Sequence, residues 1–198
     1  EQAVKQTEKS FINQPQTEYL WNAKPRFGKT LAVYDLCLRM KFKNILVVTN
    51  RPAIADSWYD DYTKFVGQSH YLFVSRMPAL LERKDPCLTR EQYLASINQP
   101  DGVKNFIEFV SLQDLKGSIH FGGNYDKLAE VAQLIWDLLV IDEAHEGVGT
   151  YKTDVAFDQI KRKHTLHLSG TPFKALANEK FPPDAIFNWT YADECKAK

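Results

Sequence analysis

The fold can be inferred outward from one segment, Leu138-Leu139-Val140-Ile141-Asp142-Glu143-Ala144-His145. Its four successive apolar residues are typical of a strand buried on both faces, as in parallel α/β sheets. Two carboxylates follow at once, so we expect Asp142 and Glu143 at the carboxyl edge of the sheet, where open α/β folds bind ligands. A buried strand followed by a polar turn is the simpler interpretation. A phosphate-binding loop elsewhere in the chain would favour the ligand site.

A second stretch, far upstream, has the pattern of such a loop. Ala23-Lys24-Pro25-Arg26-Phe27-Gly28-Lys29-Thr30 follows the apolar segment 19–21 and precedes a helix-like run, 31–40. Strand, loop, Gly-Lys-Thr and helix is the order that a P-loop requires. Backbone N–H groups and the helix dipole would hold phosphates there. The alternative is a basic turn at the start of a core helix.

The loop departs from the usual P-loop pattern at two positions. Ala23 stands in place of the first glycine, and Arg26 stands where a further glycine is common. Both residues restrict positive φ angles, and Pro25 stiffens the loop further. We interpret the loop as a variant that still binds nucleotide, because the Gly-Lys-Thr segment is intact. The expected nucleotide-binding residues are Arg26, Phe27, Gly28, Lys29, Thr30 and Leu31.

Composition sets broad limits. A length of 198 residues suits one domain, or one domain with an insertion. The 25 basic and 25 acidic residues balance, so net charge neither favours nor excludes nucleic acid as a partner. Three widely separated cysteines have no metal-binding spacing and fit a reducing compartment. The chain has no apolar run long enough for a membrane span and starts unlike a signal peptide, so we expect a cytoplasmic location.

The rest of the chain predicts alternating strands and helices. Further strands are expected at 44–49, 71–74, 106–112 and 165–168, with helices at 1–12, 53–65, 127–134 and 154–160. This alternation predicts an α/β fold with a mostly parallel sheet and helices on both faces. Residues 76–105 are charged and rich in turn formers, and we expect an insertion at the rim of the sheet. Within it, Thr89 and Gln92 have the spacing of a capping box.

Several of these motifs together resemble a known family. The segment 142–145, Asp-Glu-Ala-His, resembles motif II, the Walker B element or DEAH box, of superfamily 2 helicases and translocases. The upstream loop resembles their motif I, the segments after residues 49 and 110 their motifs Ia and Ib, and 169–172, Ser-Gly-Thr-Pro, their motif III. The resemblance covers about residues 19–172 and implies a RecA-like P-loop NTPase fold. The loop and motif III look most like the helicase subunits of type I or type III restriction enzymes.

The resemblance implies ATP hydrolysis coupled to movement on nucleic acid, with ATP and Mg²⁺ as cofactors. Lys29 would hold phosphate oxygens, and Thr30 and Asp142 would hold Mg²⁺. Glu143 would orient and deprotonate the attacking water, help that is worth roughly 10²–10⁴ in rate. The expected catalytic residues are therefore Lys29, Asp142 and Glu143.

Two further groups of residues take their roles from the same resemblance. The first would couple the nucleotide to the nucleic acid: His145, Ser169 and Thr171. The second would contact nucleic-acid phosphates: Asn50, Arg51 and Ser111. Structural alternatives stay open, since His145 also suits a cap after the strand, Arg51 a solvated loop and Ser111 a helix cap.

The resemblance also implies partners and a domain plan. The expected partner is nucleic acid, most of all double-stranded DNA, with restriction and modification subunits as further partners and no membrane. We expect residues 1–175 to form the first motor domain and 176–198 to begin the connection to a second RecA-like domain of the full-length chain. An arginine finger contributes roughly 10³–10⁵ in rate to such enzymes, and none is found here, so these residues alone should hydrolyse ATP poorly.

Three other functions stay open. An RNA helicase would share every motif named above. A regulatory module that binds nucleotide without hydrolysing it would have no need of Glu143 as a base. A P-loop enzyme that phosphorylates a small molecule would leave the Ser-Gly-Thr-Pro segment unexplained.

Overall fold

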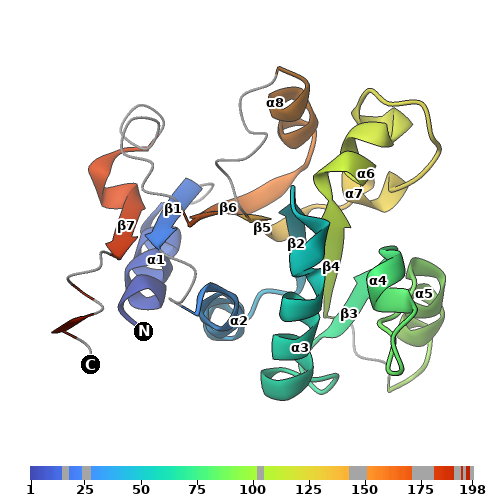
Figure 1. Ribbon diagram of the computed structural model, residues 1–198, viewed down its shortest axis with the longest axis horizontal. Helices are drawn as coiled ribbons and strands as arrows, with labels where there is room; N and C mark the ends of the chain where they lie inside the picture. Colours follow the sequence, from blue (N-terminus) through green and yellow to red (C-terminus); the bar gives the residue numbers. More distant parts are fainter. Residues whose placement is uncertain are drawn as a thin grey trace.

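The computed structural model describes residues 1–14, 18–23, 28–101, 105–142, 151–170, 181–189, 193 and 195–196. The described chain forms one seven-stranded sheet with the strand order β3-β4-β2-β5-β6-β1-β7, and every pair of neighbouring strands is parallel. Helices cover both faces of the sheet (Figure 1). The predicted α/β fold with a mostly parallel sheet is confirmed.

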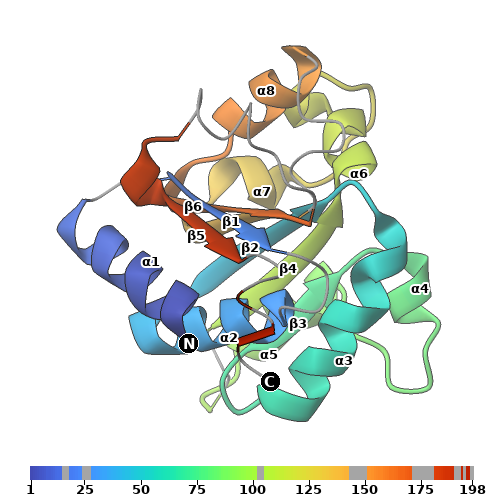
Figure 2. The same ribbon diagram turned by 60° about the vertical axis from the view of Figure 1, so that its left-hand side comes forward.

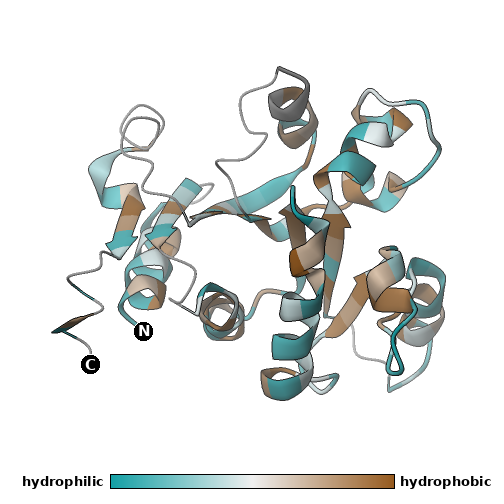
Figure 3. Ribbon diagram, viewed as in Figure 1, coloured by the Kyte–Doolittle hydropathy of each residue, from teal (hydrophilic) through white to brown (hydrophobic). Residues whose placement is uncertain are grey.

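Six of the seven strands lie close to their predicted positions, and β7 was not predicted. Their bounds are β1 Glu18–Ala23, β2 Asn44–Thr49, β3 Leu72–Ser75, β4 Phe106–Ser111, β5 Trp136–Asp142, β6 Arg162–Ser169 and β7 Ile186–Trp189. All six residues of β4 are buried, and so are all four of β3. Strands that are covered by helices on both faces need apolar residues on both faces. This is why they appear in the sequence as continuous apolar runs. Figure 3 shows this hydrophobic colouring along β3.

The helices form two layers that pack on opposite faces of the sheet (Figure 2). The first layer contains α1 Gln2–Asn13, α2 Lys29–Met40, α3 Ala55–Phe65 and α4 Pro78–Leu81. The second contains α5 Arg90–Ile97, α6 Leu112–Gly117, α7 Ala129–Gln133 and α8 Tyr151–Asp158. Single 3₁₀ turns occur at η2 Pro52–Ile54, η3 Ile119–Phe121 and η4 Pro183–Ala185.

Among the helices of the described ranges, none combines the length and the apolar character that crossing a membrane requires.

The side chains of β4 alternate between the two faces of the sheet and pack beneath the first and the second helix layer in turn. Ile107 and Phe109 pack in the core beneath the first layer, and Phe106 and Val110 pack beneath the second. Glu108 lies between Phe106 and Val110 on the face that the second layer covers, and it is only 1% exposed. A carboxyl group in this position is unusual, because carboxyl groups are almost never fully buried unless they are paired.

The segment expected as a rim insertion lies along the outer edge of the sheet. Leu88 bridges to Val74 of β3, which is the edge strand. The predicted capping box is present at the start of α5: the N–H of Gln92 donates to Oγ1 of Thr89 (3.2 Å), and the N–H of Thr89 donates to Oε1 of Gln92 (2.9 Å). That this segment is an insertion stays a prediction.

The chain after residue 175 differs from expectation. β7 pairs in parallel with β1, with Leu20 opposite Ile186, and thereby joins the same sheet. Nδ2 of Asn22 also donates to Oδ1 of Asn188 (3.0 Å). The sheet therefore extends beyond residue 175, and the domain boundary expected there stays a prediction. β7 has only four residues and follows a pair of prolines, so its pattern is too short to separate it from a linker.

Candidate nucleotide and magnesium site

The sheet order brings the two principal motifs to one edge. All strands run in the same direction, so β1 and β5 both end at the carboxyl edge, and β6 lies between them and pairs with both. At about 4.8 Å per strand, the ends of β1 and β5 are roughly 10 Å apart. In the strand order, the strand after β1 (β2) lies toward the β3 edge of the sheet, whereas the strand after β6 (β7) lies at the opposite edge. This is the kind of switch point at which α/β sheets bind ligands.

The start of α2 is built to receive an anion. Gly28, the N-cap, is in the left-handed region with φ 73°, and among the described residues, its chain neighbours apart, no atom lies within 4 Å of where a Cβ would stand. The first helical hydrogen bond runs from the N–H of Ala32 to the carbonyl of Gly28 (3.0 Å), so the N–H groups of residues 29–31 face the loop side of the helix start. The first turn has no acidic side chain to compete with an anion.

Asp142, the last residue of β5, is only 7% exposed. Its Oδ2 accepts a hydrogen bond of 2.8 Å from the indole N–H of Trp58 on α3. Thr49, the last residue of β2, lies opposite Asp142 in the sheet and is fully buried. Oγ1 of Thr49 accepts the N–H of Arg51 (3.0 Å) and so holds the turn that leads into α3. The acid is therefore positioned by a strand on one side and a helix on the other.

Trp58 also connects α3 to α2. The hydroxyl of Tyr34 donates to the backbone carbonyl of Trp58 (2.7 Å), and the two rings meet edge to face with centroids 5.6 Å apart. Burial raises the pKa of Tyr34 well above its ordinary value, so its hydroxyl stays a neutral donor. One series of contacts thus joins the helix that begins with Lys29 to the strand that ends with Asp142.

Neither Trp58 nor Tyr34 was among the residues predicted for the site. A signal was available in the sequence, because Trp58 lies on the buried side of an amphipathic helix. A buried indole N–H usually has an acceptor. The sequence could not indicate that the acceptor is Asp142, which is 84 residues away.

The predicted nucleotide-binding residues that the structure describes lie together. Gly28, Lys29, Thr30 and Leu31 form the start of α2, and the ammonium nitrogen of Lys29 is shielded from solvent. Leu31 is 38% exposed. Five predicted site residues lie outside the described residues: Arg26, Phe27, Glu143, His145 and Thr171.

Four further predicted residues lie at or just beyond the same edge of the sheet. Ser169 ends β6, which places it between the loop strand and the acid strand. Asn50 and Arg51 follow β2 and are exposed. Ser111 ends β4 but is buried, and its hydroxyl accepts the N–H of Asp114 (3.1 Å) as the N-cap of α6. The structure therefore supports the helix-cap alternative for Ser111 over a phosphate contact.

The residues present fit a magnesium nucleotide. Backbone N–H groups and the ammonium of Lys29 suit phosphate oxygens. The hydroxyl of Thr30 and the carboxylate of Asp142 are oxygen ligands, and Mg²⁺ in nucleotide sites takes one or two carboxylates together with phosphates and waters.

The fold and this edge of the sheet define a RecA-like P-loop domain. The chain belongs to the family described as "Type III restriction enzyme, res subunit", whose family model matches residues 1–174. A putative type II restriction enzyme and methyltransferase of Mycoplasma pneumoniae, RM.MpnORF110P C-terminus, is 26% identical over 98% of this chain. The chain spans 31% of the length of that relative. The predicted resemblance to restriction-type helicase subunits is confirmed.

Solved structures with the same fold include a restriction-modification enzyme, an ATPase core and a helicase. The Type ISP restriction-modification enzyme LlaGI has a TM-score of 0.72 at 11% identity, over 99% of this chain and 20% of that one. The SWI2/SNF2 ATPase core of Sulfolobus solfataricus has a TM-score of 0.60 at 16% identity, over 91% and 33%. The UvsW helicase of bacteriophage T4 has a TM-score of 0.55 at 15% identity, over 94% and 58%. At these identities the likeness establishes the fold alone.

Proposed function

We propose that this chain is the ATP-hydrolysing motor domain of a restriction-type enzyme that moves on double-stranded DNA. The observation that carries the proposal is the shared sheet edge. The anion-binding start of α2 and the buried carboxylate at the end of β5 face one switch point, with β6 between them. Membership of the res-subunit family supports the role in a restriction system.

In the proposed mechanism the chain binds and orients the triphosphate. The N–H groups of residues 29–31 and the ammonium of Lys29 hold phosphate oxygens, and Thr30 and Asp142 hold the metal. When bound, Mg²⁺ neutralises negative charge on the phosphates. Glu143 accepts the proton of the attacking water. That role is the one implied by the resemblance of residues 142–145 to motif II.

Duplex DNA is the proposed track. Asn50 and Arg51 would contact backbone phosphates, which position a protein on DNA without reading its sequence. The similar SWI2/SNF2 core was solved in complex with dsDNA, and LlaGI with a DNA substrate mimic. His145, Ser169 and Thr171 would couple the two sites, and Ser169 ends the strand between β1 and β5.

We also propose that the full-length protein has a second RecA-like domain, reached through a connection after β7. This domain would supply the arginine finger, so the 198 residues alone should hydrolyse ATP about 10³–10⁵ times more slowly. The length of the curated relative, of which this chain spans 31%, supports a larger protein.

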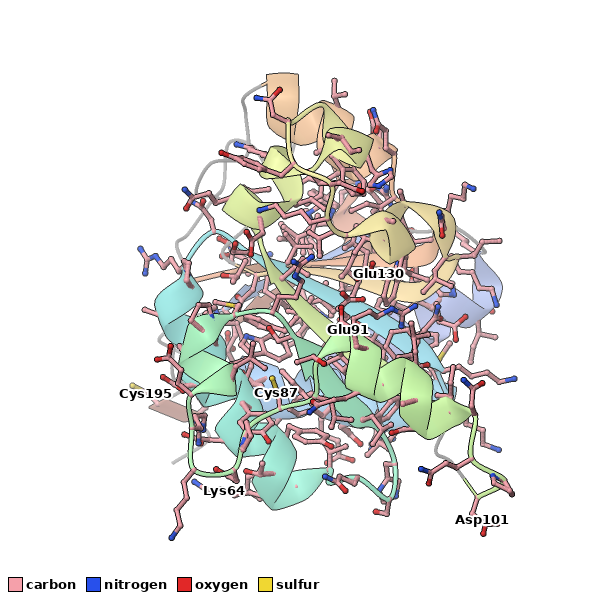
Figure 4. All side chains as sticks on the ribbon, turned by 90° about the vertical axis from the view of Figure 1, so that its right-hand side faces the viewer. Lys64, Cys87, Glu91, Asp101, Glu130 and Cys195 are labelled. Carbon is pink, nitrogen blue, oxygen red and sulfur yellow. The ribbon has the colours of Figure 1, made fainter. Side chains whose placement is uncertain are left out.

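The test is ATP hydrolysis by the full-length protein, measured with duplex DNA, with RNA and without nucleic acid. We expect stimulation by duplex DNA and its loss in Lys29→Ala. The matched control is Lys64→Ala, which removes an exposed cation from the last turn of α3, away from the site (Figure 4). Stimulation by RNA alone would favour the RNA helicase, and hydrolysis independent of nucleic acid would favour the small-molecule kinase. Nucleotide binding without hydrolysis would favour the regulatory module.

A further inference from the structure

The contact between Trp58 and Asp142 has the properties of an orienting hydrogen bond. An indole N–H can only donate and an ionised carboxylate can only accept, so the direction of the bond is unambiguous. Both side chains are buried, at 1% and 7% exposure, and the donor–acceptor distance is 2.8 Å. Hydrogen bonds to a charged group in such surroundings are stronger than neutral ones. The bond therefore restricts how the carboxylate of Asp142 can turn.

The indole itself is held from several sides. Tyr34 of α2 packs edge-on against it and bonds its backbone carbonyl, and Phe109 of β4 lies beneath it with ring centroids 6.1 Å apart. Turning the indole away would open the packed layer between α2, α3 and the sheet, which a close-packed core resists. The donor is thus in place before any ligand binds.

We propose that Trp58 is a positioning residue that orients the carboxylate of Asp142 for the Mg²⁺ of a bound nucleotide. Carboxylates that bind metals are commonly oriented by such neighbours, and loss of the neighbour typically costs 10–100-fold in metal affinity or activity. Through Tyr34 the same contact ties this orientation to α2, which begins with Lys29 and Thr30. The inference rests on the proposed function of the site, and it adds to it a residue outside the helicase motifs.

The experiment measures how much Mg²⁺ strengthens nucleotide binding. The affinity of the full-length protein for a fluorescent, non-hydrolysable ATP analogue is determined in EDTA and in excess Mg²⁺. The ratio of the two dissociation constants is the metal-dependent gain. Trp58→Phe keeps an aromatic ring but removes the N–H donor. We expect the gain to fall by about 10-fold or more, with the affinity in EDTA unchanged.

Trp136→Phe is the matched control. Trp136 is also fully buried, and its N–H donates to the carbonyl of Val131 (3.1 Å) beneath the second helix layer. This substitution removes the same kind of hydrogen bond without touching Asp142, so we expect the gain to keep its wild-type value. Thermal unfolding shows whether both variants fold. If Trp58→Phe fails to fold, Tyr34→Phe takes its place, with a smaller loss of the gain expected.

A gain that is equal in Trp58→Phe, Trp136→Phe and wild type would overturn the inference. In the replacement test, a wild-type gain in Tyr34→Phe would do the same. Lys29→Ala in the same assay separates this failure from failure of the proposed function. If Lys29→Ala keeps wild-type affinity in both EDTA and Mg²⁺, then nucleotide does not bind at the start of α2, and the site itself is misassigned.

Discussion

Two carboxyl groups are buried in this sheet, in surroundings that differ in kind. Asp142 ends β5 at the carboxyl edge and accepts the N–H of Trp58. Glu108 lies mid-strand in β4, and within the described part of the chain its Oε2 has no hydrogen-bond partner. The acid that interacts with it is Glu130 of α7. Figure 4 shows Glu130 of α7 and Glu91 of α5 on the face of the sheet that the second layer covers.

The surroundings of Glu108 favour a neutral acid. Burial raises the pKa of Glu108 well above its ordinary value, and the hydrogen bond and charge of Glu130 raise it further, against the opposing charges of Arg90 and Arg76. A protonated carboxyl group can donate as well as accept, which suits a neighbour that is itself an acid. Asp142 has a donor instead, which suits an anion that meets a cation. Burial alone does not distinguish a ligand site from a core position, whereas the bonding partner does.

The largest expected difference between the two groups is in catalysis. Asp142→Asn removes a proposed metal ligand, and the loss of several kcal/mol of charge stabilisation should slow ATP hydrolysis by about 10³-fold. Glu108→Gln should leave hydrolysis at the wild-type rate. Steady-state rates of the two full-length variants check this prediction. If Glu108→Gln folds normally but hydrolyses ATP slowly, then Glu108 also contributes to catalysis, and the two carboxyl groups do not differ as proposed.

The next effect is on the pH dependence of stability. Because the pKa of Glu108 is higher in the folded state, the folded protein binds more protons than the unfolded chain above the ordinary pKa of about 4.5. This group's contribution is therefore fully present at low pH, and it declines by up to about 1.4 kcal/mol per pH unit as the pH rises toward the folded pKa. Glu108→Gln should remove this decline. The variant should then gain stability over wild type as the pH rises, measured by denaturant unfolding between about pH 5 and pH 8.

Glu91→Gln is the control for that measurement. Glu91 is an exposed carboxylate of α5, and its pKa is lowered by the backbone N–H at the helix start and by Thr89. It is ionised in both states across this pH range, so its removal should leave the slope unchanged. If the slopes of Glu108→Gln and wild type coincide, Glu108 is not held neutral.

Smaller effects should distinguish exposed from buried polar residues at the carboxyl edge of the sheet. Arg51 is exposed and is proposed to contact DNA phosphate. Arg51→Ala should weaken binding to all duplex sequences equally and reduce the salt dependence of the logarithm of the binding constant by about one unit. Fluorescence anisotropy over a range of salt concentrations measures both, with Lys64→Ala as the control. A salt slope identical to that of wild type would remove Arg51 from the interface.

Ser111→Ala should lower stability and leave DNA binding unchanged, the reverse of what is expected for Arg51→Ala. The hydroxyl of Ser111 caps α6, so its loss should lower the free energy of unfolding by about 1 kcal/mol. Affinity for DNA should stay at the wild-type value. Thr89→Ala, at the capping box of α5, provides a second cap of the same kind for comparison. If Ser111→Ala has wild-type stability but binds DNA more weakly, then Ser111 contacts phosphate, as first predicted.

The sequence predicted the parts of this protein that depend on local pattern. The bounds of β2 and the capping box at Thr89 match the structure, because an apolar run and a four-residue cap carry their own signal. The Gly-Lys-Thr segment and the acidic strand end were both expected at the carboxyl edge of the sheet, where the structure has the start of α2 and the end of β5.

Features that depend on distant contacts could not be predicted. β7 joins the sheet only because β1, far away in sequence, offers a free edge, and nothing in its four residues indicates that partner. Trp58 reaches Asp142, and Tyr34 both bonds the carbonyl of Trp58 and packs against its ring, only because α2 and α3 lie side by side. Ser111 had two interpretations, and the cap is favoured only by its bond from the N–H of Asp114, which the sequence does not show.

We propose above that the start of α2 and the end of β5 hold one magnesium nucleotide. The most direct test compares Lys29→Ala and Asp142→Asn by the affinity of the full-length protein for an ATP analogue, with and without Mg²⁺. Lys29→Ala should weaken binding by about 10–100-fold in both conditions, as expected for a lost charged hydrogen bond. Asp142→Asn should weaken it only when Mg²⁺ is present. Wild-type affinity in both variants would show that magnesium nucleotide does not bind between these two elements.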